Sequence, residues 1–329
     1  MKLSVKILTA IAALLLCSAE FLFAKDAVFN GENYNINLSY NDTASPGDAV
    51  FIRMSFTDIS KKTKKSADSI SSSAELYLDD KKISSSEFYN LPDSSSHSKL
   101  VYLTGIPLSS WWTEGNYHLT VIYSFDGGKN MQFDLPFSLT SKEFISETIE
   151  LDEKNTDIKT DTSPERMKQI ERLNSILEKI DDNAIYQTGK FTLPTTSTRR
   201  TSFFADRRVY AYTNGKSSTS LHYGIDFGIP TGTSVTSCGN GKVVLAENRV
   251  STGWSVVVEH LPGLYTLYYH MSELNVKAGD MVKTGDRLGL SGATGLATGP
   301  HLHWEVRLNM CAVSPDFFTT DFTFANTSK

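Results

Sequence analysis

Short strand-type segments separated by turn residues run through most of this chain, and they limit the folds that are open to it. In the first half, DAVFIRMSF (49–57), KLVYLTGI (99–106) and YHLTVIYSF (117–125) each mix β-branched or aromatic residues with polar ones. Turn signals such as DGG (126–128) separate these segments. Strands at this spacing predict an antiparallel β-sandwich, immunoglobulin-like in outline, over residues 26–150.

The second half continues the pattern, with the strand-length runs GTSVTSCGNGKVVLAENR, GWSVVVEH and LYTLYYH. No helical periodicity occurs between 201 and 318, so this part is also expected to be a mainly antiparallel β-sheet. One amphipathic helix is predicted at 163–183, where apolar residues recur at intervals of three and four. Ser163 can cap it, with Pro164 at the first helical position. The chain is therefore expected to be mainly β, with an acidic linker and this helix at 151–190 between two domains.

Residues 1–24 have the pattern of an export signal. Two lysines precede an apolar run that is too short for a comfortable membrane span. Ala19 and Ala24 offer cleavage sites, of which Ala24 is favoured, while Cys17 leaves lipidation or a retained anchor as alternatives. The protein is expected in the periplasm or cell envelope, with membrane association only if this segment is retained or lipidated. The formal net charge of -5 argues against a nucleic-acid partner.

Removal of the signal would leave two cysteines, Cys238 and Cys311. In an exported protein such a pair permits a disulfide. No spacing rule links the two, so two separate buried thiols are at least as good an interpretation. Neither cysteine fits a zinc-knuckle pattern, and cysteine is therefore excluded as a metal ligand.

Histidines concentrate the candidate chemistry in the C-terminal part of the chain. His301 and His303 stand two apart in GPHLHWEVR, and in an extended strand such residues point to the same side. His222 and Asp226 stand four apart on a segment that Gly224 allows to bend. Imidazole and carboxylate are donors suited to zinc. Two imidazoles and one carboxylate, from His222, Asp226 and His303, would leave a fourth position open, which is the mark of a catalytic zinc site.

The other histidines need roles of their own. His270 ends an apolar and aromatic strand. If the metal takes three ligands, His270 and His301 remain free to move protons or to hold a developing oxyanion. His260 ends a strand before a turn and is interpreted as a structural or substrate-rim residue. His97 lies in a serine-rich loop and His118 in a strand, and both are expected to be structural.

The segment 191–318 resembles the lysostaphin-type (LytM-like) zinc metallopeptidases, which cut peptide bonds in bacterial peptidoglycan. HYGIDF, YYHMSEL and GPHLHWEVR occur in this order, with Gly-Asp repeats between the last two. The resemblance implies a β-sheet fold with a groove on one face and hydrolysis by a zinc-activated water. By the same resemblance the zinc ligands are His222, Asp226 and His303, and the catalytic pair is His270 and His301. Residues 319–329 remain as a C-terminal tail.

Two positions depart from the family pattern. The usual Phe-Gly before the site is Phe204-Ala205 here, and Met271 follows His270 where leucine is usual. Some relatives place a tyrosine upstream of the first ligand as an oxyanion donor, and no tyrosine stands at the matching distance here. The alternative to a hydrolase is a non-hydrolytic cell-wall binding or regulatory protein that retains a zinc site. Because all five site positions are present, an active hydrolase is favoured.

Overall fold

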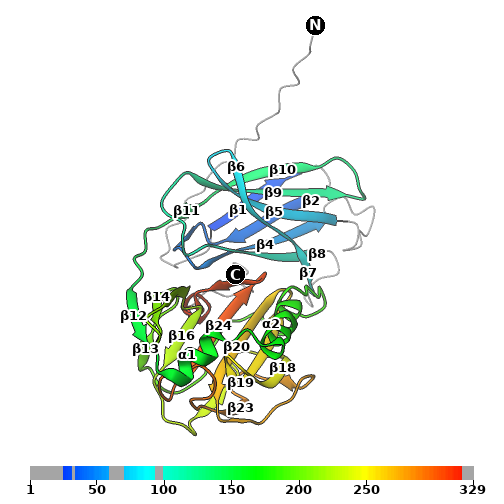
Figure 1. Cartoon of the computed structure of the whole chain (residues 1–329). Helices are drawn as coiled ribbons and strands as arrows, with labels where there is room; N and C mark the ends of the chain where they lie inside the picture. Colours follow the sequence, from blue (N-terminus) through cyan, green and yellow to red (C-terminus); the bar gives the residue numbers. More distant parts are fainter. Residues whose placement is uncertain (1–24, 32–33, 59–69, 93–98, 321–329) are drawn as a thin grey trace.

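The computed structural model describes residues 25–31, 34–58, 70–92 and 99–320, which form two β-rich lobes (Figure 1). The prediction of a mainly β chain is confirmed. The proposed export signal, Cys17 and His97 lie outside the described residues. Within the described ranges no helix is long and apolar enough to cross a membrane.

Two antiparallel sheets form the N-terminal lobe (Figure 1). The sheet β1-β2-β4-β8-β7 has strands at Lys25–Asn30, Tyr34–Tyr40, Ala49–Asp58, Lys99–Pro107 and Tyr89–Leu91. The sheet β10-β9-β5-β6 has strands at Met131–Pro136, Tyr117–Phe125, Ile70–Leu78 and Lys81–Glu87. A short parallel pair joins β3 (Thr43–Ala44) to β11 (Ser138–Leu139). Alternate residues of both sheets, such as Ile52, Leu76 and Leu119, share one core, so this lobe is a sandwich; its likeness to immunoglobulin domains stays a prediction.

The next strand, β12 (Ser146–Glu150), does not join the sandwich. It pairs in parallel with β14 (Arg207–Ala211), which also pairs with β15 (Ser217–Leu221). The prediction that placed this segment among the sandwich strands is therefore wrong. The alternation of side chains along this strand does not show which sheet it joins, because both lobes offer sheet edges.

Two helices follow in the acidic linker. Helix α1 (Glu153–Thr160) was not predicted, because its sequence EKNTDIKT has almost no apolar residues to repeat; Asp152 caps it by accepting from the Asn155 backbone N–H at 2.8 Å. Helix α2 (Pro164–Leu177) starts at the predicted cap Ser163 but ends before the predicted residue 183. Leu177 and its neighbours on the apolar stripe pack on the C-terminal sheet, and Figure 1 shows the helix lying beside β18.

The C-terminal lobe is built on an antiparallel sheet in the order β13-β16-β24-β20-β19-β18-β22, with β25 paired to β24. Its strands are Arg200–Ser202, Gly224–Phe227, Leu302–Leu308, Leu264–Met271, Gly253–Leu261, Gly241–Arg249, Met281–Val282 and Cys311–Val313. A smaller sheet, β17-β23-β21, comprises Ser234–Thr236, Arg287–Leu290 and Glu273–Leu274. One short helix, α3 (Pro315–Thr319), interrupts the stretch expected to lack helices, because five residues are too few to show a period.

One hydrophobic cluster crosses from one lobe to the other. It contains Phe51 of the sandwich and Phe318 of the C-terminal lobe, whose ring centroids lie 6.0 Å apart. Polar contacts seal the same boundary: the Arg207 guanidinium donates to the Ser110 carbonyl at 2.7 Å, and Asn309 donates to the Gly105 carbonyl at 3.0 Å. The sandwich is therefore packed against the C-terminal lobe and not merely tethered to it.

The two remaining cysteines are free thiols, so a disulfide between them is not formed. Cys238 is fully buried in the core, and burial raises the pKa of its thiol to about 12. Cys311 is exposed. The interpretation as two separate thiols is confirmed, but the expectation that both are buried is wrong for Cys311.

His260 is a core residue. It is fully buried, its Nδ1 donates to the Asn240 carbonyl at 2.7 Å, and its Nε2 lies 2.7 Å from the Thr266 hydroxyl. This rules out the substrate-rim alternative and leaves the structural one. His118 stacks on Tyr77 at 4.9 Å between ring centroids, far from the histidine cluster in sequence and in lobe.

We expect His260 to make the fold sensitive to acid. Burial lowers its pKa from the ordinary 6.5 to about 4. The unfolded chain therefore takes up this proton at a higher pH than the folded chain, so stability is complete above about pH 6.5 and falls as the pH approaches 4. The loss should reach about 3 kcal/mol.

Urea unfolding of metal-free wild type and His260→Gln, compared at pH 7 and pH 4.5, measures this effect. Both proteins contain the other titrating groups, so the difference between their two stability losses isolates the contribution of His260. Equal losses of stability in the two proteins would contradict the prediction.

Candidate metal and catalytic site

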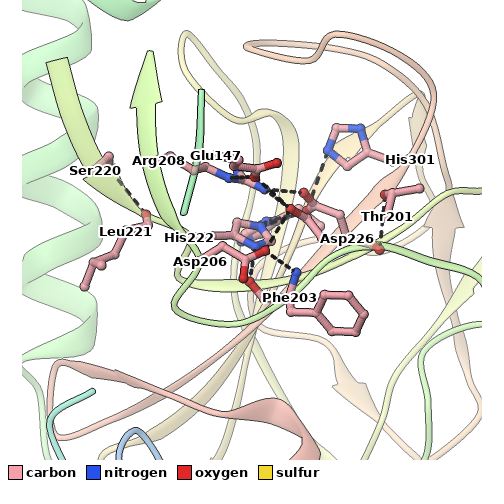
Figure 2. A network of polar contacts seen from close by, with 12 residues as sticks. Glu147, Thr201, Phe203, Asp206, Arg208, Ser220, Leu221, His222, Asp226 and His301 are labelled. Carbon is pink, nitrogen blue, oxygen red and sulfur yellow. Dashed lines mark hydrogen bonds and ion pairs between the residues drawn. The ribbon is translucent and has the colours of Figure 1, made fainter. Parts of the chain in front are cut away.

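Three side chains that stood apart in the sequence converge on one point at the β16–β24 pair. The His222 Nε2 atom lies 3.0 Å from the Asp226 Oδ1 atom and 3.0 Å from the His303 Nδ1 atom, and Oδ1 lies 2.9 Å from that Nδ1 atom (Figure 2). Ligand atoms around a tetrahedral zinc ion stand about 3.3 Å apart, given bonds of about 2.0–2.1 Å. Among the described residues, this buried trio can hold a metal ion.

Strand pairing places two of the three ligands. Asp226 on β16 lies directly opposite His303 on β24, so their side chains share one face of the sheet. The close pairing depends on Gly224, because a Cβ there would stand 2.3 Å from the Trp304 carbonyl oxygen and 2.8 Å from the His303 Nε2 atom. Gly224 lies within the strand, so its role is to leave room and not, as the sequence suggested, to bend the chain.

His222 lies in the turn that precedes β16. Its carbonyl accepts from the Ala205 N–H at 2.7 Å, and its own N–H donates to the Asp206 carbonyl at 2.9 Å. Ala205 adopts a φ of 64°, the left-handed region that favours glycine. Glycine, the residue of the family pattern, adopts this conformation without strain, whereas Ala205 adopts it at a steric cost.

Hydrogen bonds fix which nitrogen of each histidine can bind a metal. The His222 Nδ1 atom lies 2.7 Å from the Phe203 carbonyl oxygen, which can only accept, so Nδ1 carries the hydrogen and Nε2 has the lone pair. The His303 Nε2 atom faces the Glu305 carboxylate at 3.5 Å, which leaves the lone pair on Nδ1. Both of these nitrogens stand within 3.0 Å of Asp226 Oδ1, so the donor set fits a metal ion that displaces the proton of His303, and the second nitrogens are held as in other metal sites.

The protonation of these ligands depends on their burial and on one another. Burial opposes ionisation of Asp226, but the charges and hydrogen bonds of His222 and His303 outweigh it and hold the pKa of the carboxyl well below its usual value. Burial lowers the pKa of His222. For His303, burial is outweighed by the hydrogen bonds to Asp226 and Glu305, which raise its pKa to about 9. A metal ion must therefore displace a proton from His303, and its binding weakens as the pH falls.

His270 and His301 stand beside the trio. Their ring centroids lie 4.7 Å apart, and the His301 Nε2 atom lies 3.8 Å from Asp226 Oδ1. The Nδ1 atoms face backbone carbonyls at 2.8 Å, of Thr294 for His270 and of Gly299 for His301. Each ring therefore carries its hydrogen on Nδ1 and offers Nε2 as a proton acceptor.

His270 is held in a strained and buried setting. Its φ is 61°, an uncommon conformation outside glycine that persists only where the surroundings impose it. Burial, followed by the proximity of His301 and His303, lowers the pKa of His270 to about 3. The imidazole is thus neutral at physiological pH, which is the form that can accept a proton.

The glycine-rich loop 291–300 holds both of these histidines. It supplies the two carbonyls that bind their Nδ1 atoms, and Gly292 forms a bridge with His301. Helix α1 contacts this loop, where Asn155 donates to the Ala297 carbonyl at 3.4 Å. The other glycine-rich segment, 277–287, contains β22 and pairs with β18.

Two residues near the metal trio were not identified from the sequence. The Arg208 Nη2 atom lies 3.1 Å from the Asp226 Oδ2 atom, and its Nε atom lies 3.0 Å from the Glu147 carboxylate (Figure 2). Neither residue has a spacing that relates it to the histidine motifs. Only the pairing of β12 with β14 brings Glu147 beside Arg208, and the periodicity of a strand does not reveal its partner.

Known proteins resemble the segment that contains these residues. Residues 220–315 match the model of Peptidase family M23. The chain is 43% identical over 108 residues to the peptidoglycan DD-endopeptidase ShyA of Vibrio cholerae, which is 33% of this chain and 24% of that protein. It is 40% identical over 91 residues to lysostaphin of Staphylococcus staphylolyticus, 27% of this chain and 19% of that protein.

A solved structure matches most of the chain in fold. It is the putative peptidase M23 from Pseudomonas aeruginosa, with a TM-score of 0.54, 22% identity, and coverage of 85% of this chain and 96% of that one. The aligned segment spans only 26% and 24% of the first curated relatives. The predicted resemblance is confirmed: residues 220–315 form an M23 metallopeptidase domain.

Proposed function

We propose that this chain, with its M23 domain at residues 220–315, is an exported zinc-dependent endopeptidase that hydrolyses peptide bonds of bacterial peptidoglycan. The observation that carries the proposal is the pairing of a three-donor metal set with two further imidazoles whose Nε2 atoms are free to accept protons. All five residues lie within 220–315, the segment that matches the Peptidase family M23 model, and the curated relatives include the peptidoglycan DD-endopeptidase ShyA and lysostaphin.

His222, Asp226 and His303 would hold the metal. Zinc suits two imidazole nitrogens and one carboxylate oxygen with an open fourth position, and when bound it supplies a water of lowered pKa and polarises the scissile carbonyl. A structural zinc site would need a fourth protein ligand, whereas among the described residues the group that could hold a metal has three members.

His270 and His301 would handle the protons. A neutral imidazole with a free Nε2 atom can take the proton of the attacking water. The imidazolium so formed can then donate through Nε2 to the developing oxyanion or to the leaving nitrogen. The carbonyls of loop 291–300 hold the Nδ1 atom of each ring, which leaves the opposite Nε2 atom for proton transfer.

Digestion of purified peptidoglycan by the protein without residues 1–24 tests the proposal. We expect new muropeptides with free peptide ends, loss of the activity with a chelator, and its return with added zinc. Mass spectrometry of the products also identifies the bond that is cut. Binding to peptidoglycan without any cleavage would favour the non-hydrolytic alternative, and cell fractionation of the full chain tests export.

A further inference from the structure

We infer that Arg208 is a positioning residue for the metal ligand Asp226, and that Glu147 of strand β12 holds Arg208 in place. The inference rests on the proposed function, because it concerns the metal on which that function depends. Both residues precede the segment 220–315 that matches the peptidase family model. The metal site of this chain would thus depend on a strand from the linker side of the molecule.

The two oxygens of Asp226 face different partners. Oδ1 stands within 3.0 Å of both ligand nitrogens, whereas Oδ2 lies 3.1 Å from the Arg208 Nη2 atom. A carboxylate whose second oxygen is held in this way cannot rotate about its Cβ–Cγ bond. It therefore presents a single oxygen to the metal, in the place that the trio requires.

Arg208 is itself fixed from several sides. Its Nε atom donates to Glu147, which lies opposite it in the β12–β14 pairing, and its Nη2 atom also contacts the Ser202 hydroxyl. Its Nη1 atom lies 3.5 Å from the Tyr210 hydroxyl. The side chain is only 11% exposed, so these contacts are shielded from water and favour one rotamer.

The positive charge of Arg208 and its positioning of Asp226 would change metal affinity in opposite directions. A guanidinium beside the site repels a divalent cation, so its removal should strengthen metal binding if repulsion were its main influence. Glu147 offsets much of that repulsion by pairing with the guanidinium. If Arg208 instead acts by positioning Asp226, its removal weakens metal binding, and the sign of the change separates the two roles.

The experiment measures zinc affinity of the purified protein by competition with a chromophoric chelator. Arg208→Met should weaken zinc binding by about 10–100-fold, the range for loss of a group that orients a ligand. Glu147→Gln should weaken it in the same direction by a smaller factor. Arg208→Lys, which keeps a charge but cannot reach Asp226 and Glu147 together, should fall between wild type and Arg208→Met.

Two matched variants serve as controls. Arg172→Met removes an arginine that pairs with Glu247 and not with Asp226, and Glu150→Gln changes an exposed carboxylate on the same strand as Glu147. Both should bind zinc as wild type does. Cobalt-substituted Arg208→Met should also show an altered visible spectrum, because a freed carboxylate can coordinate through both oxygens.

Zinc binding by folded Arg208→Met that is equal to or tighter than wild type overturns the inference. If Arg208→Met does not fold, unchanged zinc affinity in Glu147→Gln overturns it. Zinc affinity is measured without substrate. A wild-type protein that binds zinc but does not cut peptidoglycan therefore overturns the proposed function and leaves the inference about Arg208 standing.

Discussion

Replacement of His303 or Asp226 by alanine should leave the purified protein with substoichiometric zinc and no measurable hydrolysis. Each change removes one of three convergent donors, and two protein ligands hold zinc far more weakly than three. The loss should be severe for Asp226 because Arg208 would then remain beside the site without the carboxylate that pairs with it. Metal analysis after dialysis against metal-free buffer measures the expected result.

The same measurement tests the assignment within the pair His301 and His303. Register places His303 opposite Asp226, and its Nδ1 atom lies 2.9 Å from Oδ1, whereas the His301 Nε2 atom lies 3.8 Å from it. His118→Ala, in the sandwich, should retain full zinc content and serves as the control. Loss of zinc in His301→Ala together with its retention in His303→Ala would show that the two roles are reversed.

Replacement of His270 or His301 by alanine should lower turnover by roughly 10²–10⁴-fold while zinc stays bound, the range for loss of a positioned acid–base group. Neither ring belongs to the trio: the centroids of His270 and His303 lie 6.2 Å apart, and both Nδ1 atoms are bound to backbone carbonyls. The metal should therefore remain, and the deficit should lie in proton transfer.

Steady-state hydrolysis of a soluble cross-linked muropeptide, with zinc content measured on the same samples, separates these effects. The expected pattern is a lower kcat at a nearly unchanged KM. Full activity in either zinc-loaded variant would exclude that histidine from the chemistry. Loss of zinc from His270→Ala would show instead that the ring supports the metal.

Local features of the sequence accounted for the donors of the site and for most of the strands. A strand alternates its faces every two residues, so HLH by itself placed two imidazoles on one side. The predicted strand 117–125 coincides with β9, and the predicted strand 49–57 with all but the last residue of β4. These features follow from residues a few positions apart, which is the range over which side-chain pattern carries information.

Only the tertiary structure decided which segments pair when they are distant in the chain. Asp226 and His303 are 77 positions apart, and Glu147 and Arg208 are 61 apart. Cys238 and Cys311 were equally compatible with a bond or with two thiols until the fold buried one and exposed the other. Strand β12 could have paired in either lobe, since its alternation fixes which side chains share a face but not which strand lies beside it. The sequence identified the candidate donors because their pattern is local, whereas the fold determined their partners because strand pairing is not.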